Sequence, residues 1–208
     1  MGIKFVPADV VKAATPPQAA AAISGADWTP RPMMAEGAPS TFVAAITNAQ
    51  VKQPVWRIRN ASPGGLFGVR WLQAGNTDKA AIRADLKTRL EWDMALPPAA
   101  KIDAYVTIGG QRHLISISGA EKPDASAPLL GPAEHKSLDE ATSNGAKWQR
   151  LSFDLGSALR KIDPDAKSWM IEAIEFGALH GDPYRWVGIN GNPMGTGYDV
   201  RGLKIGAG

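Results

Sequence analysis

Apolar and polar side chains alternate along many short segments of this chain, and this period of two constrains the fold more than any other feature. Residues 102–108 alternate in this way, and residues 90–94 and 150–155 repeat the pattern. Successive side chains of a β-strand point to opposite faces of a sheet, so alternation predicts strands with one buried face. Some nine or ten such segments, separated by Gly and Pro clusters, predict an all-β antiparallel sandwich of two sheets.

Two hairpins are predicted from turn residues between alternating segments. Gly109-Gly110 joins residues 102–108 to residues 113–118, and a Ser-Pro-Gly-Gly turn joins residues 55–59 to residues 66–72. Both turns contain the glycines that tight hairpin connections favour. We therefore expect each pair of segments to form neighbouring strands of one sheet.

Three further local features are predicted from the residues. The stretch 119–145 contains three prolines and many small polar residues, which predicts a long loop. Residues 157–162 have the pattern of one short helical turn, and Asp154 just before them is expected to accept backbone N–H groups in a structural role. Gly202 is expected to form a β-bulge, because the apolar spacing around it changes from two to three.

Composition bounds the domain organisation and the classes of partner. Residues 1–40 are rich in Pro and Ala and are expected to form an arm or linker, with the sandwich domain over residues 41–208. The formal net charge is only +3 and the basic residues form no stripe, which argues against a nucleic-acid partner. No apolar run approaches the ~20 residues of a membrane helix, so no membrane span is expected.

The order of several motifs resembles the jelly-roll carbohydrate-binding modules with the galactose-binding-like fold. These motifs lie at residues 90–108, 113–119, 148–155, 174–177, 191–195 and 198–205. The resemblance extends over residues 55–205. It implies a non-catalytic sandwich from a secreted or cell-surface bacterial protein, often one with several domains, so other domains of the same parent protein are expected partners beside the carbohydrate.

The resemblance also bears on a structural calcium ion. Many such modules have an acidic residue on the last strand that helps to hold calcium, whereas this chain has Val200, Arg201 and Gly202 there. Calcium needs several hard oxygen ligands, and an arginine at that position opposes it. No other cofactor is expected, since the chain has no Cys and its three His are far apart.

The seven tryptophans of this chain could provide flat surfaces for sugar binding, but several of them alternate in step with apolar residues that are expected in the core. Trp56, Trp71 and Trp92 are in phase with apolar neighbours on their segments and are assigned to the core. Trp28 is expected to anchor the arm, and Trp169 is ambiguous. Aromatic rings in the opposite phase, or in turns, are the candidates for a ligand face, because sugar C–H faces pack on flat rings.

Eight residues are the candidates for ligand binding. Two aromatic rings lie out of phase with the apolar rows of their strands, and two more follow a Gly-Asp-Pro turn, with arginine and asparagine close by. The candidates are Tyr105, Trp148, Arg150, Tyr184, Arg185, Trp186, Asn190 and Asn192. Each ring has an ordinary alternative role, either solvent exposure or packing beneath a loop.

The function expected from these residues is non-catalytic recognition of a poly- or oligosaccharide through exposed aromatic rings. The alternative is a structural or protein-docking sandwich domain of a larger secreted or cell-surface protein, in which the same rings pack another domain. A small hydrolase is the third possibility and would need two convergent carboxylates in a pocket. We expect no enzymatic activity and assign no catalytic residue.

Overall fold

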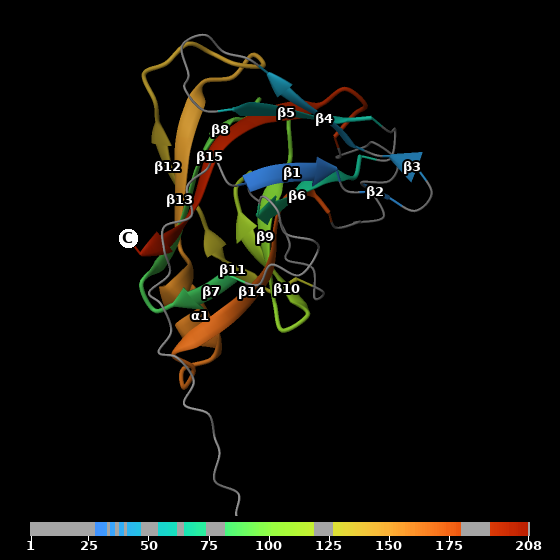
Figure 1. The fold of residues 1–208 in the computed structure, drawn as a ribbon. Helices are drawn as coiled ribbons and strands as arrows, with labels where there is room; N and C mark the ends of the chain where they lie inside the picture. The colour runs from blue at the N-terminus through green and yellow to red at the C-terminus, as the bar shows by residue number, and fades with distance from the viewer. Residues whose placement is uncertain are drawn as a thin grey trace, which may run out of the picture.

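The computed structural model describes residues 28–32, 34–35, 38–39, 41–46, 54–61, 65–73, 82–118, 127–179 and 192–207. Two main β-sheets make up most of this part of the chain, and they pack face to face as a β-sandwich (Figure 1). The expected all-β fold of two packed sheets is therefore confirmed.

The first sheet has seven strands. In spatial order they are β1 (Trp28–Pro32), β6 (Phe67–Gln73), β14 (Ser168–Ala178), β9 (Asp103–Ile108), β10 (Gln111–Ser116) and β11 (Leu129–Pro132), while β7 (Ile82–Asp85) also pairs with β14. The end of the predicted arm therefore contains a strand of the sandwich, because β1 pairs with β6. Residues 1–27 lie outside the described residues.

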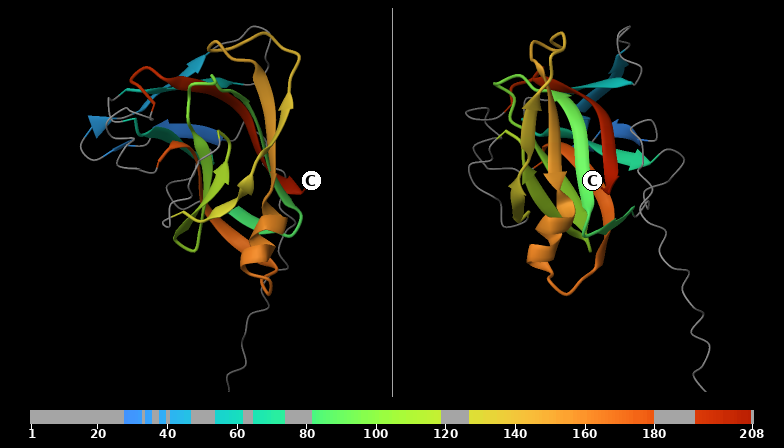
Figure 2. Two further views of the ribbon diagram at one scale, coloured as in Figure 1. Left: turned by 180° about the vertical axis from the view of Figure 1, so that it is seen from behind. Right: turned by 90° about the vertical axis from the view of Figure 1, so that its left-hand side faces the viewer.

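The second sheet has six strands. In spatial order they are β12 (Glu134–Ser137), β13 (Trp148–Asp154), β8 (Thr88–Ala95), β15 (Gly197–Ala207), β5 (Val55–Asn60) and β4 (Thr41–Ile46). Two short strands, β2 (Met34–Ala35) and β3 (Ala38–Pro39), pair with each other. The single described helix, α1 (Leu155–Ile162), lies at one end of the sandwich (Figure 2).

The core fills the space between the sheets with side chains that the alternation assigned to it. Trp92, Trp71 and Phe176 are buried there, and the ring of Phe176 lies within 6 Å of both tryptophan rings: 5.1 Å from Trp92 and 5.9 Å from Trp71, centroid to centroid. Tyr198 of β15 donates a 2.9 Å hydrogen bond to the Phe176 carbonyl on the other sheet. Trp56 is only partly buried and packs on the edge of this core.

One of the two predicted hairpins is confirmed and the other is wrong. β9 and β10 pair antiparallel across Gly109-Gly110, and both glycines have the positive φ that such a turn requires, 56° and 75°. β5 and β6, in contrast, belong to different sheets, since β5 pairs with β4 and β15. Turn residues indicate a change of direction, but they do not say whether the next strand returns to the same sheet.

The predicted long loop over residues 119–145 is partly wrong, because it contains β11 and β12. β11 also pairs parallel with β10, which is an exception to the antiparallel pattern. β11 has Gly131 and Pro132, and all four residues of β12 are exposed. Such short edge strands give little periodicity, so the sequence pattern does not reveal them.

The local predictions around Asp154 and Gly202 are confirmed. Asp154 caps α1, because its Oδ1 accepts a 2.9 Å hydrogen bond from the Ser157 amide. The register of β15 on β8 shifts between Arg201 and Lys204, and Gly202 has a φ of 63° at this bulge. In the described part of the chain, no helix is long and apolar enough to cross a membrane.

Candidate functional site

The predicted ligand-binding residues are distributed over different parts of the sandwich. Trp148 and Arg150 lie on the outer face of the six-stranded sheet, Tyr105 lies on the outer face of the seven-stranded sheet, and Asn192 precedes β15. The structure therefore brings only Trp148 and Arg150 of these four to one face, and Tyr105 and Asn192 lie elsewhere. Four further candidates fall outside the described residues: Tyr184, Arg185, Trp186 and Asn190.

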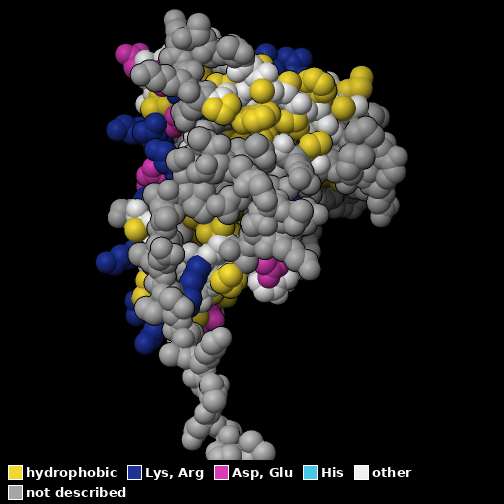
Figure 3. Space-filling view, in the orientation of Figure 1, with side chains coloured by type: hydrophobic (Ala, Val, Ile, Leu, Met, Phe, Trp, Pro, Cys, Tyr) yellow, Lys and Arg dark blue, Asp and Glu magenta, His cyan; other side chains and the backbone are white. Residues whose placement is uncertain are grey.

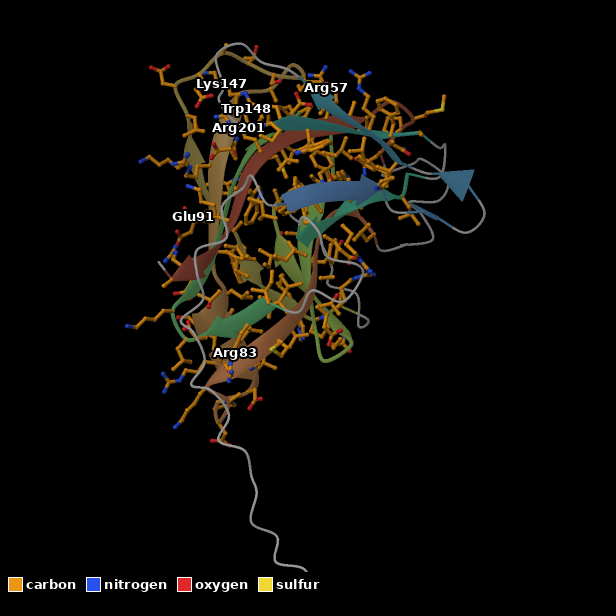
Figure 4. The ribbon with its side chains drawn as sticks, viewed as in Figure 1. Arg57, Arg83, Glu91, Lys147, Trp148 and Arg201 are labelled. Atoms are coloured by element: carbon orange, nitrogen blue, oxygen red, sulfur yellow. The ribbon has the colours of Figure 1, made fainter. Side chains whose placement is uncertain are left out.

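The prediction that the Trp148 ring is exposed is wrong. Its phase on β13 does place it on the outer face, but only 2% of the residue is exposed. It packs with Val55, Ala95 and Ala146 in a small apolar cluster separate from the main core. Figure 4 shows Arg201 beside it, and the guanidinium carbon lies 4.3 Å from the ring centroid.

The segment 138–147 between β12 and β13 is bonded to this outer face. Ser143 donates a hydrogen bond to Asp199, and Asn144 Nδ2 donates a 2.8 Å bond to the Gly197 carbonyl on β15. Glu140 accepts two 2.7 Å bonds from Arg201 Nη2. These bonds hold the segment against β15, and Ala146 of the segment packs in the cluster of Trp148. The segment therefore covers this part of the outer face and leaves the Trp148 ring inaccessible to a ligand.

Arg150 belongs to an ion-pair group that we call the Asp93 cluster, formed by Asp93, Arg150, Arg201 and Glu140. Arg150 Nε donates a 2.8 Å bond to Asp93 Oδ1, and Arg201 Nε lies 3.2 Å from Oδ2. Its hydrogen bond with the carboxylate raises the pKa of Arg150. Two guanidinium groups and two carboxylates balance each other in this cluster, and Arg201 and Asp93 are both buried.

The prediction that Tyr105 is exposed is also wrong. Its side chain does leave the core side of β9, as its phase predicts, but only 2% of the residue is exposed. It forms a second small apolar cluster with Leu114, Ala127 and Leu179. The Arg112 guanidinium lies over the ring, with its carbon 5.9 Å from the ring centroid. A charged neighbour and an apolar cluster therefore cover the ring.

A second ion-pair group, which we call the Glu175 cluster, lies beside this ring and comprises Glu175, Arg70 and Arg112. Arg70 donates to Glu175 Oε1 from Nε at 2.9 Å and from Nη2 at 2.7 Å. Arg112 Nε lies 2.8 Å from Glu175 Oε2. The Glu175 side chain is 0% exposed, whereas those of Arg70 and Arg112 are 41% and 29% exposed.

The two clusters have a similar arrangement of ion pairs but differ in net charge. In each, a buried carboxylate on an inner strand of a sheet binds two arginines from other strands. Glu140 adds a second carboxylate to the Asp93 cluster, whereas no second carboxylate pairs with Arg70 or Arg112 among the described residues. The Glu175 cluster therefore has a net charge of one positive unit at its partly exposed side, and we take it as the candidate functional site.

Asn192 is buried and acts as a clamp, because its hydrogen bonds join it to Lys101 and to Asn60. Its Oδ1 accepts a 2.8 Å bond from the Lys101 amide, and its Nδ2 donates a 2.8 Å bond to the Lys101 carbonyl. Asn60 Nδ2 donates to the Asn192 carbonyl at 2.8 Å. Its side-chain groups are used within the protein, so the prediction of a free polar partner for a ligand is wrong for Asn192.

The position where the resemblance implied an acidic calcium ligand holds Arg201, whose guanidinium already lies between the carboxylates of Asp93 and Glu140. A guanidinium in this place supplies the positive charge that a cation would bring. Within the described residues, no group of three His, Cys, Asp or Glu side chains could hold a metal ion.

Sequence reasoning did not find Arg70, Arg112 or Glu175. The available signal was a charged residue at the outward phase of an apolar strand, as with Glu175 between Ile174 and Phe176. The pairing itself was not visible, because Arg70 and Glu175 are 105 residues apart. No protein-family model matches this chain, and no curated protein matches it.

Proposed function

We propose that this chain is a non-catalytic carbohydrate-binding domain of the jelly-roll, galactose-binding-like type, from a secreted or cell-surface protein. The observation that carries the proposal is the Glu175 cluster. A fully buried carboxylate there fixes two partly exposed arginines beside an aromatic ring, on the outer face of a sheet. Planar arginine side chains with several N–H donors suit the hydroxyl groups of a sugar.

The predicted aromatic pair, Tyr184 and Trp186, remains part of the proposal as a prediction from the sequence and lies outside the described residues. Leu179 packs in the cluster of Tyr105 and is followed directly by the segment that contains Tyr184, Arg185 and Trp186. The segment ends at Asn192, which is clamped to Lys101. Tyr184 and Trp186 are proposed to supply the flat surface for a sugar, because the rings of Tyr105 and Trp148 are buried.

The affinity expected for such a site is modest. Stacking of one sugar ring contributes on the order of 1 kcal/mol by analogy with aromatic pairs. One or two platforms with a few hydrogen bonds then correspond to dissociation constants in the micromolar to millimolar range. Attachment to another domain that acts on the same polysaccharide would raise the effective concentration and so compensate for weak binding.

Calorimetric titration with a panel of soluble oligosaccharides tests the proposal. We expect at least one glycan to bind, and Trp186→Ala and Arg70→Met each to weaken it at least fivefold. Arg57→Met on the opposite sheet is the matched control, because it removes a partly exposed arginine from a similar pair with a buried carboxylate, that of Asp199. If no glycan in a broad panel binds to the folded protein, the proposal is wrong.

A docking role for the domain is the second candidate, and exposed apolar side chains favour it. Phe42 on the edge strand β4 is 57% exposed, and Met194 before β15 is 68% exposed. Figure 3 shows hydrophobic side chains gathered over β5 and β4. Phe42→Ser should then abolish binding to a neighbouring domain of the parent protein without changing glycan binding, as measured by calorimetry with each ligand.

A further inference from the structure

We infer that the glycan recognised at the Glu175 cluster carries an acidic group, a carboxylate or a sulfate, which binds between Arg70 and Arg112. This inference rests on the proposed function and adds the class of ligand to it. Two similar ion-pair clusters lie on the two outer faces of the sandwich, and only the Asp93 cluster has equal numbers of positive and negative charges.

Charge balance separates the two clusters. The Asp93 cluster has two arginines and two carboxylates, and Arg201 in it is buried. The Glu175 cluster has two arginines and one carboxylate, and that carboxylate is 0% exposed. Burying the carboxylate fixes the two guanidinium groups, while one positive charge remains uncompensated among the described residues. An anionic group would balance this charge, as Glu140 does on the other sheet.

The unused hydrogen-bond donors match such a group. Arg70 directs Nε and Nη2 to a single oxygen of Glu175, so its Nη1 makes no hydrogen bond within the described residues. Arg112 contacts Glu175 through Nε, and neither of its Nη groups makes a hydrogen bond to another residue in the described part of the chain. Guanidinium groups bind carboxylates and sulfates through paired N–H donors, and a fixed guanidinium loses less side-chain entropy on binding than a mobile one.

Neutral sugars would not require this arrangement. Hydroxyl groups are recognised by donors and acceptors together, and the oxygens of Glu175 already face two arginines. What the cluster offers outward is donors with positive charge, from side chains that are 41% and 29% exposed. An acidic group adds attraction between opposite charges and can accept two parallel N–H bonds from one guanidinium, so an acidic sugar gains more here than a neutral one.

The experiment uses pairs of ligands that differ only in the acidic group. The chain of 208 residues is titrated calorimetrically with an oligogalacturonate and its methyl ester, and with a sulfated galactan and its desulfated form. We expect one acidic member to bind at least tenfold more tightly than its neutral partner. Which pair shows the difference identifies the acid as a carboxylate or a sulfate.

Variants of the two arginines in the Glu175 cluster test whether the acidic ligand binds there. Arg70→Met and Arg112→Met should each weaken binding of the acidic ligand at least tenfold, and Arg57→Met, which breaks the pair with Asp199 on the other sheet, should leave it within twofold. The lysine variants Arg70→Lys and Arg112→Lys, which keep the charge but lose the paired donors, replace any methionine variant that does not fold, and they should show an intermediate loss.

The outcomes separate this inference from the proposed function. Equal binding of the acidic and neutral members would overturn the acidic ligand and leave glycan binding intact. Tight binding of an acid that survives Arg70→Met and Arg112→Met unchanged would overturn the Glu175 cluster as its site. If neither these ligands nor a neutral panel binds, both conclusions are wrong.

Discussion

The guanidinium of Arg201 lies over the ring of Trp148, 4.3 Å from its centroid, and both side chains are almost entirely buried on the outer face of a sheet. Cation–π contact is strongest on tryptophan and in a desolvated setting. Arg201 also bonds to Asp93 and Glu140, so one side chain joins the apolar cluster of Trp148 to the ion pairs that hold the segment 138–147.

Replacing Trp148 with alanine should therefore destabilise the protein. Loss of a buried tryptophan removes its packing and leaves a cavity, which costs about 3–5 kcal/mol. Urea denaturation followed by circular dichroism measures the free energy of unfolding. Lys147→Ala is the control, because this neighbouring residue is exposed and should change stability by only ~0.5 kcal/mol or less. A Trp148 variant as stable as the parent protein would contradict the burial of this ring.

Gly156 should not tolerate alanine, although it lies in a helix. Exchange of glycine for alanine inside an exposed helix normally stabilises by roughly 1 kcal/mol. Here a Cβ atom would lie 2.5 Å from the Asp85 carbonyl oxygen and 2.5 Å from the Leu86 carbonyl carbon, both of which belong to the backbone. We expect Gly156→Ala to lower the melting temperature, with Arg160→Ala on the exposed side of α1 as the control. A raised melting temperature would mean that α1 does not pack so closely on the β7–β8 turn.

Asp154 should stabilise α1 in a pH-dependent way. Its side chain caps the helix through Ser157, and this hydrogen bond lowers the pKa of Asp154 from 3.8. Since the folded-state pKa is lower than that of the unfolded chain, the stabilisation is complete above about pH 3.8 and is lost below it. Asp154→Ala should cost about 0.5–2 kcal/mol at pH 7. Asp154→Asn should keep most of the cap and lose the pH dependence, which denaturation between pH 5 and 3 would show.

His113 should make the protein less stable in mild acid. It is buried opposite Val106 on the inward side of β10, and desolvation lowers its pKa from 6.5. The unfolded chain therefore binds a proton at a higher pH than the folded protein does. Stability should be full above pH 6.5 and fall as the pH drops below it. Melting temperatures at pH 7.5 and 5.5 measure this slope. His113→Gln should flatten it, and an unchanged slope in that variant would contradict the assignment to His113.

Much of the architecture could be predicted because it is encoded locally. Alternation identified the strands over residues 90–94, 102–108 and 150–155, and the Gly109-Gly110 turn identified the hairpin of β9 and β10. Asp154 was correctly expected to have a structural role, since an acidic side chain before a helical turn can cap it. These features depend on residues close together in the chain.

The candidate site could not be predicted in the same way. Phase placed Trp148 and Tyr105 correctly on outer faces, yet both rings are covered, by the segment 138–147 in one case and in part by Arg112 in the other. The alternation of apolar and polar residues shows toward which face of a sheet a side chain points, because that direction follows from backbone geometry. It does not report what packs on that face.

The longer strands, their inward rows and the helix cap are thus encoded in the sequence itself, through interactions between near neighbours, whereas short edge strands such as β11 and β12 are not. Tertiary structure alone decided that β5 and β6 separate into two sheets, that Asn192 is a clamp, and that Glu175 binds both Arg70 and Arg112. The physical reason is distance along the chain. Charges far apart in sequence meet only when the sheets have formed, and the free energy of an ion pair depends on the separation and burial that this folding creates.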